Sequence, residues 1–394
     1  MKINVPQNVI TALGLLEKAG FEAYAVGGCV RDSLLGKTPY DWDVCTSAKP
    51  QETVAVFENY RTIPTGIKHG TVTVIIDSPM EITTFRVDGE YLDNRRPEQV
   101  SFTAELKADV CRRDFTVNAM AVNREGEITD LCGGMEDLEK RLIRCVGQPQ
   151  KRFDEDALRI IRALRFAATL GFEIEEETAA AIIQKKNLLN NIAVERITAE
   201  FSKLLKGNCG KILVNFGSVF NVFMPQAEIT EKIAFQVEAA PCELEIRLAV
   251  LLQNLNSGAA AELLKNMRFS NGIIKSVQEL AEYKDILFVA EKPCVKRVMN
   301  KIGVEGAKRL ALFKEAIGLS QSDELIKMID EIEGVQECYT LSRLAVRGCD
   351  LSEIGLADRQ IGKALHALLE CVISEEVVNE KTALLSCAKD LKLG

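Results

Sequence analysis

The stretch AYAVGGCVRDSLLGKTPYDWDV, residues 23–44, decides the fold of the first part of the chain. Its apolar start, residues 23–26, predicts a short buried strand, and the later VRDSLLG predicts a helical turn. Between them, Gly27 and Gly28 lack Cβ atoms, so their backbone N–H groups can approach phosphate oxygens at a helix N-terminus. The glycine pair therefore predicts a triphosphate-binding turn, and a purely structural tight turn is the alternative.

Two acids at strand spacing follow this turn. Asp41 and Asp43 stand at i and i+2, so in a strand both carboxylates point to one face. Two convergent carboxylates suit Mg²⁺, which prefers oxygen ligands and commonly binds one or two carboxylates together with substrate phosphates. The acids predict a metal site that acts on a phosphate, and two solvated or capping acids are the alternative.

The glycine turn and the acid pair together resemble the nucleotidyltransferase signature of the class II tRNA nucleotidyltransferase and bacterial poly(A) polymerase family. Further segments carry the same resemblance: DNRRPEQVSF (93–102), RRDFTVNAMA (112–121), DLCGGMEDLEKRLIR (130–144), RFDEDALRIIRALRFAATLGF (152–172) and ERITAEFSKLL (195–205). The resemblance is specific up to about residue 205, and beyond it the chain resembles the family's tail only loosely.

The hydrophobic period changes once along the chain. Up to about residue 130, short β-type runs alternate with helical segments, whereas from Leu138 onward the pattern is almost wholly helical. We therefore expect an α+β protein, and the resemblance implies a polymerase beta-like nucleotidyltransferase head followed by all-α modules. The expected domains are a catalytic head, a helical neck that recognises the base, a helical body and a helical tRNA-binding tail, at residues 1–138, 139–206, 207–270 and 271–394.

The resemblance also implies a two-metal nucleotidyl transfer with Asp41 and Asp43 as catalytic metal ligands. One Mg²⁺ lowers the pKa of the RNA 3′-hydroxyl, and the other neutralises the leaving pyrophosphate. Glu81 lies in the expected strand EITTFR and is the candidate third ligand. A solvated glutamate at the strand edge is the alternative.

Nucleotide contacts outside the glycine turn are expected from Arg31 and from RRDFTVNAMA. Arg113 and Asp114 match the family's phosphate- and ribose-contacting pair, because a guanidinium suits phosphate and a carboxylate accepts from sugar hydroxyls. Asn118, four residues after Asp114, falls on the same helical face if the segment is helical, and it would then support the ribose site. A capping aspartate with an arginine salt bridge is the alternative.

The segment DNRRPEQVSF is polar, turn-rich and interrupted by proline, which predicts a flexible loop. Its charged positions are Asp93, Arg95 and Arg96. In the family, a loop with this signature is needed for addition of the final A.

Base selection is expected from EDALRIIR, residues 155–162. On a continuous helix Glu155, Asp156, Arg159 and Arg162 would share one face. A carboxylate only accepts and a guanidinium only donates, so Asp156 and Arg159 could pair with cytosine and adenine, which present a donor beside an acceptor. Uracil and guanine present the reverse and would be rejected. Glu155 and Arg162 would hold this pair in place, and an exposed salt-bridge ladder is the alternative.

Composition agrees with a cytoplasmic enzyme. The chain has 394 residues, 47% of them hydrophobic, and no apolar run long enough to span a bilayer. Its twelve cysteines form no C-x-x-C pair and are expected to be reduced structural thiols. The formal net charge of −8 means that any RNA-binding surface must be local.

The predicted function is template-independent addition of CCA to the tRNA acceptor end, with CTP and ATP as substrates. A poly(A) polymerase that adds AMP to RNA 3′ ends is the nearest alternative, because it shares the head and helix motifs. A catalytically silent RNA-binding protein is the alternative of another class. The intact acid pair argues against it, since binding alone requires no metal site.

Overall fold

The computed structural model describes residues 2–88 and 100–390, which divide into two compact units, residues 1–225 and 226–394. The predicted loop residues Asp93, Arg95 and Arg96 lie outside the described residues. The four-domain division of the chain stays a prediction. Among the described residues, none of the helices combines the length and apolar character needed to cross a membrane.

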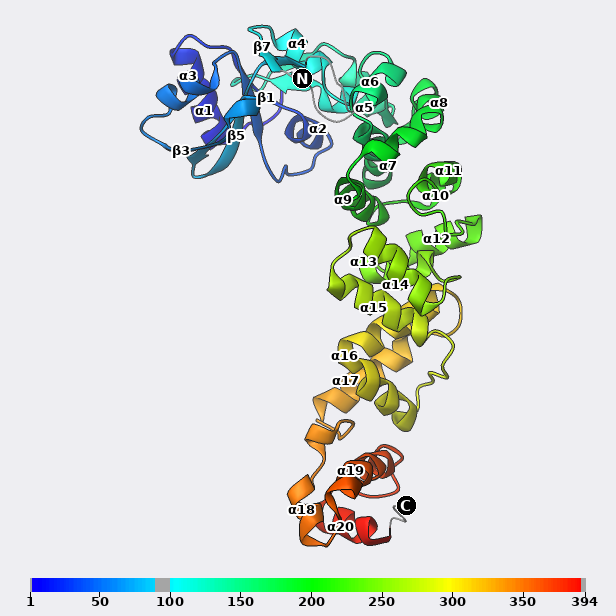
Figure 1. The fold of residues 1–394 in the computed structure, drawn as a ribbon. Helices are drawn as coiled ribbons and strands as arrows, with labels where there is room; N and C mark the ends of the chain where they lie inside the picture. The colour runs from blue at the N-terminus through cyan, green and yellow to red at the C-terminus, as the bar shows by residue number, and fades with distance from the viewer. Residues whose placement is uncertain (1, 89–99, 391–394) are drawn as a thin grey trace. The chain divides into compact units, whose positions relative to one another are not determined.

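The first unit contains a seven-stranded mixed sheet in the order β3-β4-β5-β2-β1-β8-β9 (Figure 1). Its strands are β1 (Ala23–Val26), β2 (Asp43–Thr46), β3 (Arg61–Gly66), β4 (Thr71–Ile76), β5 (Ser78–Thr84), β8 (Met120–Val122) and β9 (Ile128–Asp130). β2 and β5 are parallel, and the other neighbours are antiparallel. A separate antiparallel pair joins β6 (Arg86–Asp88) to β7 (Val100–Phe102). The predicted strand, glycine turn and helix are confirmed as β1, Gly27 and α2 (Gly28–Leu34).

Helix α1 (Gln7–Lys18) shows why the helices of this unit pack on the sheet. Its buried residues are Val9, Ala12, Leu13 and Leu16, at the i, i+3, i+4, i+7 spacing of one helix face. The other short helices around the sheet are α3 (Pro50–Val56), η1 (Ile67–His69), α4 (Leu106–Cys111), η2 (Thr116–Asn118) and α5 (Gly134–Glu139). Leu106 and Val110 of α4 belong to a core cluster with Val26 and Phe85.

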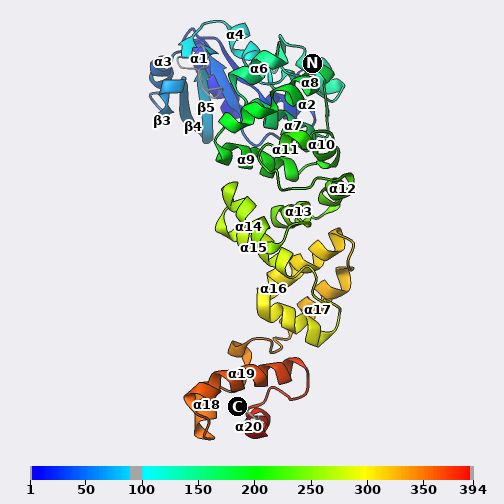
Figure 2. The same cartoon turned by 45° about the vertical axis from the view of Figure 1, so that its right-hand side comes forward.

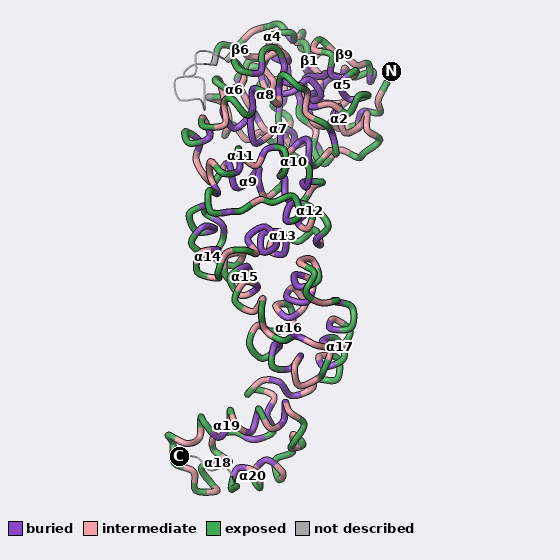
Figure 3. The backbone as a smooth tube through the Cα atoms, turned by 90° about the vertical axis from the view of Figure 1, so that its right-hand side faces the viewer, coloured by how far each residue is buried: buried purple, intermediate pink, exposed green. Residues whose placement is uncertain are grey.

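Beyond α5 the first unit is mainly helical, as predicted, but a two-stranded parallel sheet of β10 (Leu142–Ile143) and β11 (Glu173–Ile174) interrupts the helices. The helices are α6 (Pro149–Glu155), α7 (Leu158–Leu170), α8 (Glu176–Lys185), η3 (Lys186–Asn191), α9 (Val194–Leu205), α10 (Gly210–Asn215) and α11 (Gly217–Phe220). α7 packs against both α6 and α9 (Figure 2). Nine of its thirteen residues are buried, so it forms the centre of this helical part (Figure 3).

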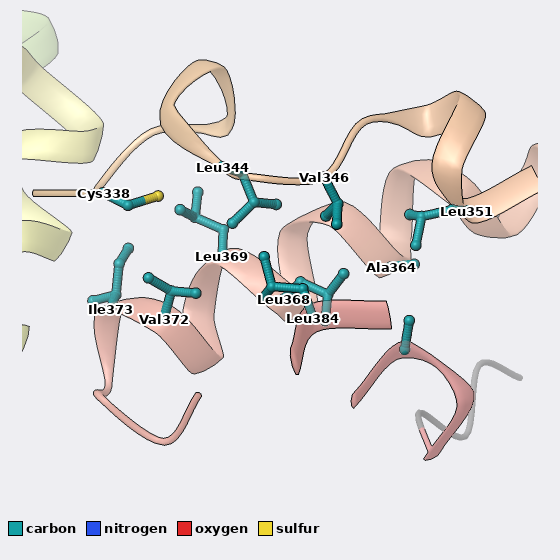
Figure 4. Packing of buried hydrophobic residues seen from close by; sticks show 11 residues of the cluster. Cys338, Leu344, Val346, Leu351, Ala364, Leu368, Leu369, Val372, Ile373 and Leu384 are labelled. Atoms are coloured by element: carbon teal, nitrogen blue, oxygen red, sulfur yellow. The ribbon is translucent and has the colours of Figure 1, made fainter. Parts of the chain in front are cut away.

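The second unit is helical. It comprises α12 (Glu231–Ala239), α13 (Leu244–Leu251), α14 (Ser257–Asn266), α15 (Asn271–Glu282), α16 (Lys292–Ala316), α17 (Asp323–Gly334), η4 (Leu341–Arg343), α18 (Gly348–Glu353), α19 (Asp358–Ile373) and α20 (Lys381–Asp390). α16 is broken at Gly303, whose φ of 72° and ψ of 178° are not helical. A core cluster with Leu351, Leu368 and Leu384 joins α18, α19 and α20 (Figure 4). The described architecture confirms the α+β expectation.

Candidate active site

Three carboxylates, Asp41, Asp43 and Glu81, lie near one another at the start of β2. β2 begins at Asp43 and Asp41 precedes it by two residues, so only Asp43 lies in the strand that the i, i+2 spacing predicted for both acids. The antiparallel register places Asp43 opposite Val26, directly before the glycine turn. The parallel register of Val44 with Ile82 brings Asp43 beside Glu81 of β5.

The proximity of these acids affects ionisation. The pKa of Asp43 is raised to about 6, first because surrounding protein removes water from it and then because Asp41 and Glu81 carry like charge. Arg113 offsets part of this rise. Asp43 nevertheless remains exposed at the strand end, so a cation could reach it.

A hard divalent cation fits this donor set, because a positive ion would offset the like charges of Asp41 and Glu81, which add to the effect of burial on the pKa of Asp43. Within the described ranges, no three His, Cys, Asp or Glu side chains already form a group that could hold a metal ion. That Asp41 and Asp43 hold a metal stays a prediction. The ligand role of Glu81 stays a prediction.

The glycine turn lies against Arg113. Gly27 has a φ of 86°, which disfavours any residue with a side chain. A Cβ there would stand 3.1 Å from Nη1 of Arg113, and a Cβ on Gly28 would stand 3.5 Å from Nη2 of Arg31. Gly27 is therefore needed for the close approach of the Arg113 guanidinium, whatever ligand binds, whereas 3.5 Å at Gly28 is an ordinary van der Waals contact.

Asp114 organises a network of side chains from three segments. Its Oδ2 accepts from Nε and Nη2 of Arg162 at 2.9 and 2.6 Å. Its Oδ1 accepts from the backbone N–H of Phe115 at 2.9 Å and from Nδ2 of Asn118 at 3.2 Å. Nη1 of Arg31 in turn donates to Oδ1 of Asn118 at 2.5 Å. These bonds occupy about four acceptor positions of the carboxylate, so a ribose hydroxyl would have to replace one of them.

The ring of Phe166 gathers three guanidinium groups. Arg31, Arg162 and Arg165 lie 5.2, 5.3 and 3.5 Å from its centroid, within cation–π range. Nε of Arg165 also donates to Glu200 of α9 at 2.9 Å. Phe166 thereby connects α2 near the glycine turn with α7 and α9.

The expectation of one continuous helix over residues 155–162 is wrong. Glu155 ends α6, Asp156 is extended with φ −139° and ψ 102°, and α7 begins at Leu158. The reason is local: Oδ1 of Asp156 accepts from the backbone N–H of Leu158 at 3.1 Å. Such a side-chain bond competes with the helical hydrogen-bond pattern.

Arg159 is held by Glu155, as predicted, and its role in base selection stays a prediction. Its Nη1 donates to Glu155 at 2.8 Å and to the carbonyl of Arg152 at 3.2 Å. Its Nη2 donates to the carbonyl of Arg112 at 3.0 Å. Arg162, expected to support the same pair, is instead hydrogen-bonded to Asp114.

Asp156 has a cationic neighbour that the sequence did not single out. Nη2 of Arg196 in α9 lies 3.7 Å from Oδ2 of Asp156. Burial raises the pKa of Asp156, and Arg196 offsets part of the rise, followed by the backbone N–H of Leu158 and then by Arg159 and Arg162. The other residues missed by sequence reasoning are Asp109, Phe166 and Glu200. Only Asp109 carried a signal, its spacing of three and four residues from Arg112 and Arg113.

A mixed sheet with the acids Asp41 and Asp43 beside a glycine turn, and helices of the same unit that carry hydrogen-bonded ionic groups, is the arrangement of a nucleotidyltransferase. Three family models match: "Poly A polymerase head domain" over residues 23–144, "Probable RNA and SrmB- binding site of polymerase A" over 171–216, and "tRNA nucleotidyltransferase domain 2 putative" over 244–388.

Curated relatives and a solved structure show which nucleotidyltransferases the chain resembles. The CCA-adding enzymes of Streptococcus suis (strain 05ZYH33) and Enterococcus faecalis are 38% and 37% identical, covering 99% and 94% of this chain and 99% and 92% of their own. The structure of the Bacillus stearothermophilus CCA-adding enzyme in complex with CTP matches with a TM-score of 0.83 and 31% identity, covering 98% of this chain and 96% of that one. The chain belongs to the family of CCA-adding enzymes, which are metal-dependent nucleotidyltransferases.

Proposed function

We propose that this protein adds CCA to the 3′ end of tRNA without a nucleic-acid template, using CTP and ATP and releasing pyrophosphate. The observation that carries the proposal is the placement, within one compact unit, of the carboxylates Asp41 and Asp43 and of the fixed pair Asp156 and Arg159. Similarity to CCA-adding enzymes along nearly the whole chain supports the same reaction.

In this proposal the sheet end performs the transfer. Asp41 and Asp43 hold the catalytic metal, for which we propose Mg²⁺ because the donors are carboxylates. When bound, the metal supplies Lewis acidity to the reacting hydroxyl and charge neutralisation to the leaving pyrophosphate. Arg113, against the glycine turn, donates to the triphosphate, and Gly27 and Gly28 leave room for it.

Arg31, Asp114, Asn118 and Arg162 form the sugar side of the site. Asp114 accepts from a ribose hydroxyl by exchanging its longest bond, the 3.2 Å bond from Asn118. Arg162 keeps the carboxylate in place during that exchange through two bonds of 2.9 and 2.6 Å. Arg31 supports Asn118 from the other side.

The helix break supplies the selection of bases. Asp156 accepts from the exocyclic amine of cytosine or adenine, and Arg159 donates to the adjacent ring nitrogen. Uracil and guanine would place a carbonyl against the carboxylate and an N–H against the guanidinium. Glu155 keeps Arg159 in one orientation through the 2.8 Å ion pair.

The test is incubation of tRNA lacking its 3′ CCA with CTP and ATP, separately and together. We expect two cytidines with CTP alone and CCA with both nucleotides. Long A tails without C would support the poly(A) polymerase alternative and overturn the proposal. The compartment we propose is the cytoplasm, where these nucleotides are available and where the twelve free cysteines would stay reduced.

A further inference from the structure

Asp109 is a buried carboxylate outside the residues predicted from the sequence. It lies in α4 between Leu106 and Val110, which pack into the core, and its own exposed fraction is 0%. A charged group in such a place requires close partners, because its isolated burial would be costly. Its partners therefore show which charges it balances.

Those partners are two consecutive arginines and one backbone amide. Oδ1 accepts from Nε and Nη2 of Arg112 at 2.9 and 2.6 Å and from the backbone N–H of Arg86 at 3.4 Å. Oδ2 accepts from Nη2 of Arg113 at 3.3 Å. One carboxylate thus holds two guanidinium groups, and the longer bond to Arg113 leaves this side chain the less completely satisfied of the two.

Arg113 extends from Asp109 toward the glycine turn. Its Nη1 lies 3.1 Å from the Cβ position of Gly27, and its charge acts on Asp43. Its Nε is buried and has no hydrogen-bond partner among the residues that the structure describes. A guanidinium that the protein satisfies incompletely and that lies against a glycine turn suits an anionic ligand.

Arg112, the second arginine held by Asp109, contacts the proposed base-selecting residue Arg159. Its carbonyl accepts from Nη2 of Arg159 at 3.0 Å, and Arg159 is the donor of the proposed base-selecting pair. The two hydrogen bonds from the Arg112 side chain to Oδ1 of Asp109 fix the residue that carries this carbonyl. Asp109 is thereby connected to both the triphosphate side and the base side of the site.

We propose that Asp109 is a positioning residue for nucleotide binding, which holds Arg113 toward the triphosphate and Arg112 against Arg159. This inference rests on the proposed function. It differs from a purely structural ion pair in its consequences, because it couples triphosphate affinity and base discrimination to one buried carboxylate that itself touches neither.

The test is Asp109→Asn in the full-length protein, assayed for single-nucleotide addition to tRNA ending before CCA or after CC. We expect KM for CTP and for ATP to rise roughly tenfold, the equivalent of one weakened charge-assisted hydrogen bond. Misincorporation of UTP relative to CTP should rise with it, while kcat at saturating CTP changes less than KM. A purely structural role would lower the active fraction and leave KM and discrimination unchanged.

Two further variants keep the test decisive. Asp109→Asn combined with Arg112→Gln removes one charge of each sign, so it retains charge balance if the single variant does not fold. Glu337→Gln is the matched control, since Glu337 also holds two cations, Lys292 and Lys296 at 2.8 and 2.6 Å, but lies in the other unit. Unchanged KM and unchanged UTP discrimination in a folded Asp109 variant would overturn the inference, whereas failure of the wild type to add CCA would overturn the proposed function instead.

Discussion

Replacing Asp114 with Asn should destabilise the first unit in a pH-dependent way. The pKa of Asp114 is about 2 instead of 3.8. Burial raises this pKa, but the charge and hydrogen bonds of Arg162, together with the bond from Asn118, lower it by a larger amount. That difference corresponds to about 2.4 kcal/mol of stabilisation of the ionised folded state. The side chain is 11% exposed, so solvent screening reduces this value little.

The direction of the pH dependence of stability follows from the lowered pKa of Asp114 in the folded state. The stabilisation is complete above the unfolded pKa of about 3.8 and is lost as the pH falls through about 2. Because Asn resembles a protonated Asp, the stability difference between wild type and Asp114→Asn should be about 2.4 kcal/mol at pH 7 and about 1.3 kcal/mol at pH 3.

The chain offers a direct assay, since its single tryptophan, Trp42, lies in the first unit. Urea unfolding followed by Trp42 fluorescence, in buffers from pH 7 to pH 3, gives the difference at each pH. A difference below about 1 kcal/mol at pH 7, or one that stays constant with pH, would refute the assigned ion pair between Asp114 and Arg162.

Three other changes test separate parts of the site. Asp43→Asn should reduce kcat by about a thousandfold, the loss of about 4 kcal/mol of metal-assisted catalysis, and should abolish any effect of added Mg²⁺ on Trp42 fluorescence. Asp156→Ala and Arg159→Ala should each lower the preference for CTP over UTP by roughly 5- to 150-fold, as measured by competing incorporation, with the Mg²⁺ response unchanged. Phe166→Leu should lower the free energy of unfolding in urea by about 1 to 2 kcal/mol more than Phe201→Leu, since three guanidinium groups contact the ring of Phe166 and none of them contacts that of Phe201. Equal losses would contradict a role for these cation–π contacts.

Sequence reasoning succeeded where the signal was local. The apolar run before Gly27 depends on a few adjacent residues, and β1, the glycine turn and α2 follow it. The strand expected to carry both Asp41 and Asp43 begins only at Asp43, so the common face of the two acids stays a prediction. It failed at Asp156, because the charges around it fit a continuous helix as well as two helices. The helix is interrupted by the hydrogen bond from the N–H of Leu158 to the Asp156 side chain, and such a bond does not change the spacing of charged or apolar residues in the sequence.

Pairings between distant segments were also beyond the sequence. Arg162 was expected to support its neighbours on the helix, yet its partner Asp114 is 48 residues away. Arg159 likewise reaches the carbonyl of Arg112, 47 residues away. Helical spacing tells which side chains share a face, but the partner on the opposing segment depends on tertiary packing. Roles assigned from spacing alone are therefore weakest for arginine, whose long side chain can reach several segments.

Selection of two nucleotides without a template places opposite demands on the site. The first demand is on space: cytosine and adenine differ in size, so the space around the base must differ between additions. The second demand is on direction: the donor and acceptor edges of the two bases can be recognised only by protein groups with fixed directions. Arg159 meets the second demand because three bonds, to Glu155 and to the carbonyls of Arg152 and Arg112, restrict its guanidinium. The carboxylate of Asp156 is fixed in direction by its hydrogen bond from the N–H of Leu158. Since Arg112 belongs to the same short segment as Arg113 and Asp114, the groups proposed to bind base, triphosphate and sugar share one piece of backbone. A displacement of that segment would therefore change affinity and specificity together.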